Sequence, residues 1–312
     1  MTKESLTILL FHRISPVRNP MWEPIQPDRF EAMLKYAKRK FEIVPLTDLI
    51  FSERNHQGKP LAAITFDDGY KDFIQYACPI LKKYGLPSTL FVVTDCIERN
   101  MPTWTYLSDH YFYYTRKLKT NSSEALNCLP SEFQETKWKS QEDRVNYGKR
   151  IKQYLKKVPS KNRNNILKYF FDNFNDVSLP EKMMLSWSEL RKISSENVEI
   201  GSHSVNHPTL ATLEDERELY FELSESKSKL LSEIASVSPV FSYPCGSFNQ
   251  KVKKATQQAG YKAALAVNGI SFKPDMLQDL YEIPRIELYD EPLWKSKMRI
   301  SGTIQLFKKW IK

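Results

Sequence analysis

The chain has few cysteines and few histidines, and both shortages narrow its chemistry. Its 312 residues include four cysteines, Cys78, Cys96, Cys128 and Cys245, and no two of them form a CxxC pair. This argues against a thiolate metal knot or a disulfide framework, so we expect a reducing compartment. Since there are only five histidines, a regular spacing between any two of them is informative.

Long hydrophobic runs are also missing. The first apolar stretch, residues 6–11, is too short for the core of a secretory signal. No segment approaches the roughly 18 apolar residues that a membrane-spanning helix needs. We therefore expect a soluble, cytoplasmic protein whose 41% hydrophobic residues build one large domain or two smaller ones.

Acidic residues are scarce in two regions of a chain whose net charge is +9. Residues 101–182 and 295–312 carry the basic excess, and the second region holds no acid. Basic surface points to anionic partners such as phosphates or a membrane surface. We expect no nucleic-acid partner, because the sequence has no zinc-finger, RNA-recognition or helix-turn-helix signature.

Apolar runs and amphipathic helices alternate in both the N-terminal and the C-terminal parts of the chain. Residues 6–11, 61–66 and 88–93 are typical of short buried strands, and residues 28–40 have helical spacing. This alternation predicts a parallel sheet with helical crossovers. Residues 96–185 break the pattern and show no clear strand, so we expect an inserted helical subdomain or lid.

The insertion opens with a dense aromatic cluster: Trp104, Tyr106, His110, Tyr111, Phe112, Tyr113 and Tyr114. Such side chains stack on sugar rings, sit at a lipid interface or form the subdomain's own core. We favour the core for most of them and keep Trp104 as a candidate substrate contact. The basic, amphipathic tail, residues 295–312, either binds an anionic membrane surface or docks on the protein as a terminal helix.

Two adjacent carboxylates, Asp67 and Asp68, follow the apolar run 61–66 and precede Gly69. Neighbouring carboxylates repel each other, and a bound cation or a hydrogen-bonding partner removes that cost. The carboxyl ends of parallel strands are also where α/β folds place their sites. Taken alone, the stretch fits an acidic strand-to-turn junction equally well.

His203 and His207 follow a second predicted strand, four residues apart. We expect this spacing to present both imidazoles on one side of a helical turn, as a divalent metal requires. Alone, such a pair is more often incidental. Together with a carboxylate from another strand end, two neutral imidazoles leave an open position for a water, as hydrolytic zinc sites require.

At these residues the sequence resembles the polysaccharide deacetylases, the NodB-homology family of carbohydrate esterases. The resemblance covers residues 5–95 and 186–288. It implies a distorted (β/α) barrel of about seven strands, an α/β fold with a helical insertion. We accordingly divide the chain into a barrel of residues 1–95 and 186–294, the insertion, and the tail.

The resemblance also implies what the residues do. Asp68, His203 and His207 bind the metal, which we expect to be Zn²⁺, and Asp67 is the general base. Tyr243-Pro244-Cys245-Gly246 matches the family's third motif, where a backbone N–H meets the oxyanion. The implied reaction is hydrolysis of an N-acetyl group from an amino sugar in a glycan or a glycan precursor.

Two features depart from the family pattern. The arginine that usually begins the third motif and steadies the base is absent, and Arg285, at the end of the last predicted strand, is the candidate substitute. No histidine follows His207, so the usual C-terminal acid is missing. Phe11-His12-Arg13 instead resembles the circularly permuted branch of the family, which places that histidine first. His12 is therefore the candidate general acid, with a strand-capping role as the alternative.

Two other functions stay open: an amidohydrolase acting on a non-sugar amide, and a catalytically silent glycan-binding protein on the same fold. The missing third-motif arginine favours a protein without catalytic activity, whereas the retained acids and histidines favour an enzyme. Because the sequence shows no export signal, we expect the substrate in the cytoplasm or on the inner membrane face. A lipid-linked or nucleotide-linked amino sugar fits that location, with peripheral membrane contact through the tail.

Overall fold

A computed structural model describes residues 6–52, 58–121, 123–267 and 279–303. Its strands are β1 Thr7–Phe11, β2 Glu42–Ile43, β3 Leu61–Phe66, β4 Ser88–Val92, β5 Val198–Ser202, β6 Val237–Ser242, β7 Ala263–Leu265 and β8 Ile286–Glu287. Its α-helices are α1 Pro27–Lys40, α2 Leu46–Phe51, α3 Cys78–Tyr84, α4 Thr94–Arg99, α5 Trp104–Tyr114, α6 Ser131–Gln134, α7 Gln141–Leu155, α8 Ser160–Asn173, α9 Trp187–Ser194, α10 Glu216–Glu233, α11 Gln250–Gln258 and α12 Leu293–Ile300. Short helical turns are η1 Phe73–Ala77, η2 Glu124–Leu126, η3 Leu210–Thr212 and η4 Pro244–Gly246.

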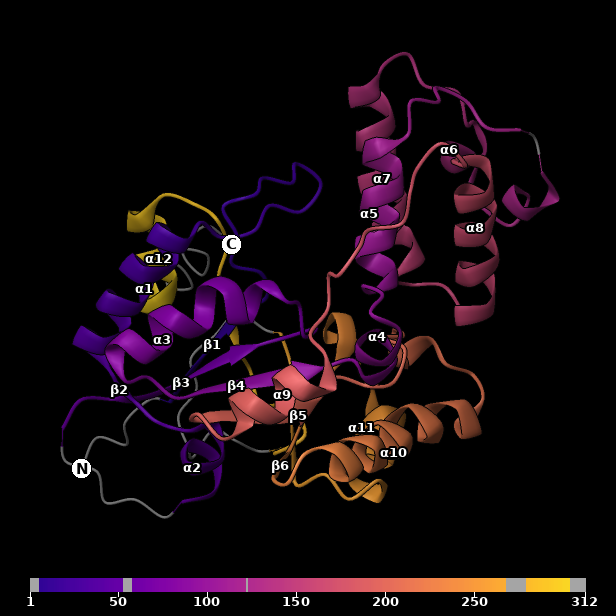
Figure 1. Cartoon of the computed structure of the whole chain (residues 1–312). Helices are drawn as coiled ribbons and strands as arrows, with labels where there is room; N and C mark the ends of the chain where they lie inside the picture. Colours follow the sequence, from indigo (N-terminus) through magenta and orange to yellow (C-terminus); the bar gives the residue numbers. More distant parts are fainter. Residues whose placement is uncertain (1–5, 53–57, 122, 268–278, 304–312) are drawn as a thin grey trace.

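One curved parallel sheet organises the fold (Figure 1). Its strands follow the order β7-β6-β5-β4-β3-β1-β8, and β2 pairs with β3 beside this path. All of these pairings are parallel, so every strand delivers its carboxyl end to the same edge. The sheet forms a half-barrel with helices around it, and the predicted distorted (β/α) barrel is confirmed.

Neighbouring residues of a strand face different hydrophobic cores. On β3, Ala63 packs with residues of β1, β6 and β7 inside the half-barrel, whereas Ile64 packs beneath the surrounding helices. On β1 the same alternation separates Ile8 from Leu9. Because side chains alternate along a strand, this pattern places Asp67, just after β3, on the inner face.

The first part of the predicted tail belongs to the packed structure. Helix α12 lies beside α1 (Figure 1), and Ile300 at its end is fully buried. Residues 304–312, which carry most of the predicted membrane contact, lie outside the described residues. Within the described ranges, no helix combines the length and the apolar character needed to cross a membrane.

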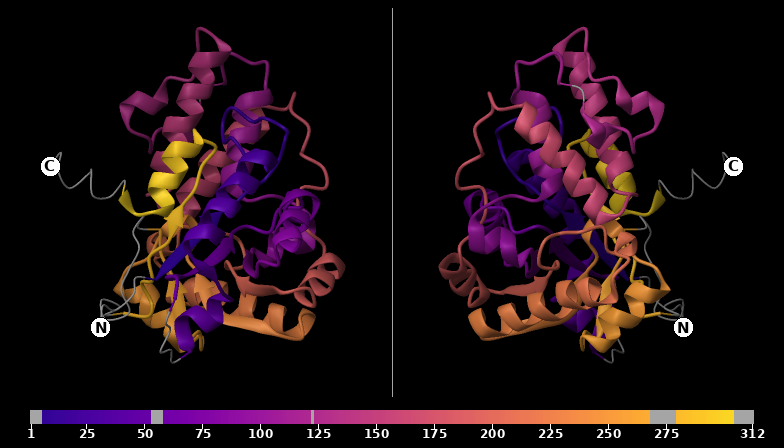
Figure 2. Two further views of the ribbon diagram at one scale, coloured as in Figure 1. Left: turned by 90° about the vertical axis from the view of Figure 1, so that its left-hand side faces the viewer. Right: turned by 90° about the vertical axis from the view of Figure 1, so that its right-hand side faces the viewer.

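Helices α5 to α8 stand together at one end of the molecule, apart from the sheet (Figures 1 and 2). They share a hydrophobic cluster of their own, which buries Tyr111 and Phe112 of the aromatic run. Tyr106 is also buried, in the main core, whereas Tyr114 is 55% exposed. Most of these aromatic side chains therefore serve packing, as we favoured.

Candidate metal centre and active site

The Asp67-Asp68 pair lies at the end of β3. The backbone turns left-handed at Asp68, and the two side chains therefore point in different directions. Asp68 has a φ of 77° and Gly69 a φ of 86°, a left-handed conformation that glycine adopts most readily. A Cβ at Gly69 would also lie 3.0 Å from the Val92 side chain. Asp67 thus continues the inner face of the half-barrel, while Asp68 lies beside the two histidines. Both acids are buried, at 2% and 3% exposure.

His203 and His207 follow β5 in a loop, so the expected helical turn is wrong. Ser204 and His207 both have left-handed φ values, 69° and 57°, which no helical turn contains. Glu222 of α10 fixes this loop, because its Oε2 accepts hydrogen bonds from two successive loop N–H groups at 2.9 Å each. The imidazoles converge through this loop conformation and not through helical periodicity.

Left-handed backbone gathers around these residues. Of the seven non-glycine residues with positive φ in the described ranges, four lie here: Asp68, Ser204, His207 and Cys245. Such conformations cost of order 1–3 kcal/mol each and cluster at active sites and ligand clamps. Their concentration at the ends of β3, β5 and β6 supports this edge of the sheet as the candidate site.

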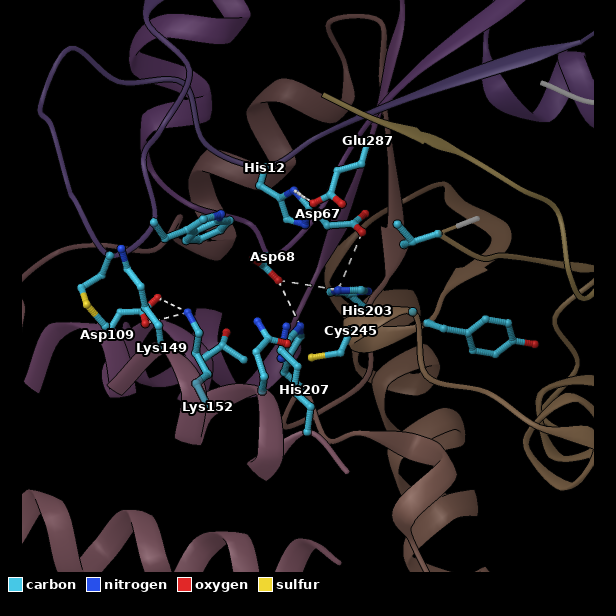
Figure 3. Close-up of a pocket in the computed structure, with 18 of the residues that line it drawn as sticks. His12, Asp67, Asp68, Asp109, Lys149, Lys152, His203, His207, Cys245 and Glu287 are labelled. Carbon is cyan, nitrogen blue, oxygen red and sulfur yellow. Dashed lines mark hydrogen bonds and ion pairs between the residues drawn. The ribbon is translucent and has the colours of Figure 1, made fainter. Parts of the chain in front are cut away.

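Asp68, His203 and His207 form a compact cluster (Figure 3). Asp68 Oδ1 lies 3.3 Å from His207 Nε2 and 3.6 Å from His203 Nε2. His203 Nδ1 lies 2.8 Å from the Ser242 carbonyl, which only accepts, so Nδ1 carries the proton and the Nε2 lone pair is free. Burial lowers the pKa of His203 to about 4, although the nearby Asp67 charge acts in the opposite direction. His203 is therefore neutral at physiological pH.

This set of donors fits a divalent cation. Asp68 Oδ1 is buried and has no hydrogen-bond partner in the described part of the chain, which is costly for a polar atom unless something binds it. The three candidate ligand atoms lie within 4.8 Å of one another. One carboxylate and two imidazoles are the ligands of catalytic zinc sites that keep a position open.

Arg285 pairs with Asp67 inside the half-barrel. Its Nη1 and Nη2 donate to Asp67 Oδ1 and Oδ2 at 2.8 and 2.7 Å, and its side chain is completely buried. Ser242 joins the pair, since its Oγ lies 2.8 Å from Arg285 Nη2 and 3.1 Å from Asp67 Oδ2. Burial alone would raise the pKa of Asp67, but the charge and hydrogen bonds of Arg285, with His203, hold it well below its usual range. Asp67 is thus an ionised carboxylate in a fixed position.

His12 lies at the end of β1 and lines the same cavity. Its Nδ1 is 3.7 Å from Glu287 Oε1, and the Trp22 ring meets it edge-on at 5.4 Å between centroids. Figure 3 shows His12 and Glu287 side by side, close to Asp67. The sequence analysis missed Glu287, although its place two residues after Arg285 puts both on one face of a strand.

The third-motif residues form the turn η4 at the end of β6. Cys245, Gly246 and Tyr243 line the cavity. The Tyr243 and Gly246 N–H groups donate to the Leu265 and Tyr243 carbonyls, and Pro244 has no N–H. The Cys245 N–H is therefore the candidate oxyanion donor of this turn.

Trp104 contacts the histidine loop. Its indole N–H donates to the His207 carbonyl at 2.9 Å, and the Arg163 guanidinium lies 4.9 Å from its ring centroid. The Trp104 side chain is not among those that line the cavity. Its predicted contact with substrate stays a prediction, whereas its contact with a candidate metal ligand is direct.

A cavity of about 610 Å³ connects these groups. The barrel side contributes the metal cluster, Asp67, His12 and the third-motif turn. The opposite wall comes from α5 and α7, including Asp109 and Lys152, which form an ion pair at 2.6 Å. The sequence showed the basic excess of residues 101–182 but not that α7 faces the strand ends.

Comparison with known proteins places this arrangement in a family. Residues 54–264 match a family model described as polysaccharide deacetylase. YxkH of Bacillus subtilis (strain 168), whose name assigns it provisionally to the polysaccharide deacetylases, is 21% identical over 289 residues. That alignment covers 91% of this chain and 71% of YxkH.

Solved structures share the fold. The Streptococcus pyogenes deacetylase PplD, determined in complex with acetate, aligns with a TM-score of 0.61 and 17% identity over 97% of this chain and 98% of its own. IcaB from Ammonifex degensii aligns with a TM-score of 0.60 and 15% identity, over 95% of this chain and 97% of its own. At these identities the likeness establishes the fold.

Proposed function

The chain belongs to the polysaccharide deacetylase family of hydrolases, and from this premise we propose that it removes an N-acetyl group from an amino sugar by metal-dependent hydrolysis. One observation supports the proposal above all. The candidate metal cluster of Asp68, His203 and His207 lies at the same cavity as the ion pair of Asp67 with Arg285. An amide hydrolase needs an activated water, a stabilised oxyanion and a proton for the leaving amine.

Asp68, His203 and His207 would hold the metal, which we propose to be Zn²⁺. A zinc ion bound there would lower the pKa of a water to about 7 and polarise the acetyl carbonyl. Asp68 supplies the charged ligand, and its unpartnered Oδ1 is the atom available for it. The Ser242 carbonyl keeps His203 in the tautomer whose Nε2 is free to bind.

Asp67 is proposed as the general base, which accepts a proton from the attacking water at a carboxylate oxygen. Arg285 and Ser242 support this role, because their hydrogen bonds fix the carboxylate and keep it ionised. Both Asp67 oxygens are engaged by these donors, so Asp67 is less suited to be a ligand than Asp68. Adjacent acids therefore take different tasks.

The remaining steps fall to His12 and Cys245. The Cys245 N–H would donate to the oxyanion that forms from the acetyl carbonyl. His12 would donate a proton to the departing amine, and Glu287 Oε1, which lies 3.7 Å from His12 Nδ1, would help to orient the imidazole.

The insertion and the sugar's carrier complete the proposal. We propose that residues 96–185 form a subdomain over the site, which is supported by the α7 side chains that line the cavity. A lipid-linked or nucleotide-linked N-acetylhexosamine agrees with the basic character of this segment.

Acetate release tests this function directly. The protein, stripped of metal and reloaded with zinc, is incubated with polyprenyl-linked, UDP-linked and oligomeric N-acetylhexosamines and with an N-acetylated amino acid. We expect zinc-dependent acetate release from a sugar substrate and none from the amino acid. Release from the amino acid alone would favour the non-sugar amidohydrolase. Zinc binding without any acetate release would favour a silent glycan-binding protein.

A further inference from the structure

One side of helix α7 faces the active-site cavity and is strongly basic. Lys149, Arg150 and Lys152 of α7 and Lys156, which directly follows its last residue, all line the cavity, and we call these four residues the α7 cationic face. Lys149, Lys152 and Lys156 recur at intervals of three and four residues, which places them on one side of a helix. In Figure 3, Lys149 and Lys152 approach the cavity from a different side than His12 and Glu287.

A single carboxylate balances this face. Asp109 of α5 pairs with Lys152 at 2.6 Å and is buried, at 1% exposure. Among the described residues, Lys149, Arg150 and Lys156 form no ion pair with an acidic side chain. Like charges on neighbouring turns of a helix destabilise it. The concentration of these cations therefore does not stabilise the fold of the free protein.

The other acids that line the cavity belong to the proposed catalytic groups. Asp67 is paired with Arg285, Asp68 lies in the candidate metal cluster with His207, and Glu287 lies beside His12. Burial raises the pKa of the Cys245 thiol, and the nearby charges of Lys156 and Lys152 oppose this shift without reversing it. Lys152 and Lys156 line the same cavity as the proposed oxyanion turn, and of these two only Lys152 pairs with an acidic side chain in the described part of the chain, Asp109.

We propose that the α7 cationic face binds an anionic group, a phosphate or a carboxylate, carried by the amino sugar whose N-acetyl group is hydrolysed. This inference rests on the proposed function and narrows its substrate to a negatively charged glycan or glycan precursor. Lysine presents a compact point charge with three donors, which suits both anions. A charged wall in a cavity also concentrates substrates of the opposite sign.

The test compares three substrates that share an N-acetylglucosamine unit. The neutral one is an N-acetylglucosamine oligosaccharide, the carboxylate one alternates N-acetylglucosamine with glucuronate, and the phosphate one is UDP-N-acetylglucosamine. Lys149 and Lys156 are changed together to glutamine (K149Q/K156Q), which removes two charges from the face. The matched control, K157Q/K161Q, removes two charges from exposed lysines that do not line the cavity.

We expect the zinc-loaded wild type to show a higher kcat/KM for one anionic substrate than for the neutral one. The ratio of the two values should fall about tenfold in K149Q/K156Q, the loss expected for charge-assisted contacts, and should be unchanged in K157Q/K161Q. The anionic substrate that responds identifies the group as phosphate or carboxylate. An equal ratio in all three proteins, or a wild-type preference for the neutral sugar, overturns the inference.

A binding measurement separates failure of this inference from failure of the proposed function. Inorganic pyrophosphate and glucuronate are titrated into the metal-free protein by calorimetry, so that neither catalysis nor a metal contributes. Weaker binding of one anion to K149Q/K156Q than to K157Q/K161Q supports the inference even if no substrate releases acetate. Identical binding of both anions to the two variants, or no binding to any form, contradicts it.

Discussion

Replacement of Arg285 by methionine tests the buried pair that positions the proposed base. Arg285→Met keeps most of the side-chain volume but removes both hydrogen bonds to Asp67, at 2.8 and 2.7 Å. Arg285 is 0% exposed and Asp67 is 2% exposed, so the methionine leaves the buried carboxylate without the two donors that balance its burial. The Asp67 carboxylate is left as a buried charge whose remaining donor in this network is the Ser242 hydroxyl.

Removing one partner of a buried ion pair costs about 3–5 kcal/mol. For a chain of this size, we expect the Tm to fall by about 5–8 °C. Asp67→Asn should cost a comparable amount, because it leaves a buried guanidinium without its anion. The double variant D67N/R285M leaves no buried charge, so its loss should be smaller than the sum of the two single losses by about 3 kcal/mol.

Urea denaturation of the metal-free proteins measures these differences as a double-mutant cycle. Arg285→Lys serves as a control that keeps the charge but cannot donate to both oxygens in one plane, and we expect an intermediate loss. If R285M loses less than about 1 kcal/mol, or if the two single losses simply add in the double variant, the buried pair does not have the energetic role assigned to it.

The same variant changes how stability depends on pH. In the wild type the pKa of Asp67 is depressed, so its contribution is present above the pKa of the unfolded chain and is lost only as the pH falls through the folded value. In R285M, burial acts without the opposing Arg285 charge and raises the pKa of Asp67. Asp67 then holds its proton to a higher pH in the folded variant than in the unfolded chain. The stability of the variant therefore falls as the pH rises above about 4. The stability gap between the two proteins should therefore widen from pH 4 to pH 7, and a constant gap would contradict this.

Three further predictions concern the histidines and their support. His12→Ala should keep its zinc but lose kcat and the alkaline limb of the pH–rate profile, and normal turnover with an unchanged limb would place the acid elsewhere. Trp104→Phe removes the hydrogen bond to the His207 carbonyl and should weaken zinc binding about 10- to 100-fold in a chelator competition; equal affinity would exclude this support. In the metal-free protein, the His203 pKa of about 4 means that the unfolded chain binds more protons between pH 4 and 6.5. Stability should therefore rise by about 3 kcal/mol across that window in urea denaturation and not in His203→Gln, and parallel pH profiles would rule this out.

The sequence was sufficient to predict the sheet and the ends of its strands. Apolar runs of strand length identified the strands, and polar residues directly after them identified Asp67, Asp68 and His203 as neighbours, because parallel strands end at one edge. Arg285 was found as a charge near the end of an apolar run, but the strand expected over residues 281–286 is wrong, because β8 begins only at Ile286 and Arg285 precedes it. These features depend on local patterns that tertiary packing does not alter.

Features set by tertiary contacts were out of reach. The loop between His203 and His207 is not helical, because Glu222 binds its N–H groups and no local pattern signals such a partner. The hydrogen bond from the Trp104 N–H to the His207 carbonyl joins distant parts of the chain, so no local pattern signals it, and the sugar contact of Trp104 stays a prediction. For the α7 cationic face, the sequence showed a basic excess but not that these side chains face the cavity. The orientation of an inserted helix depends on its packing.

The assignment of different tasks to the two neighbouring acids is the central claim, and one paired measurement tests it. Zinc content and acetate release are determined on the same preparations of wild type, Asp67→Asn and Asp68→Asn, each purified with zinc present. We predict that Asp67→Asn retains one zinc per chain and loses turnover by about 10²- to 10⁴-fold, whereas Asp68→Asn loses both. Loss of zinc from Asp67→Asn, or full zinc content in Asp68→Asn, would contradict the separation of base and ligand.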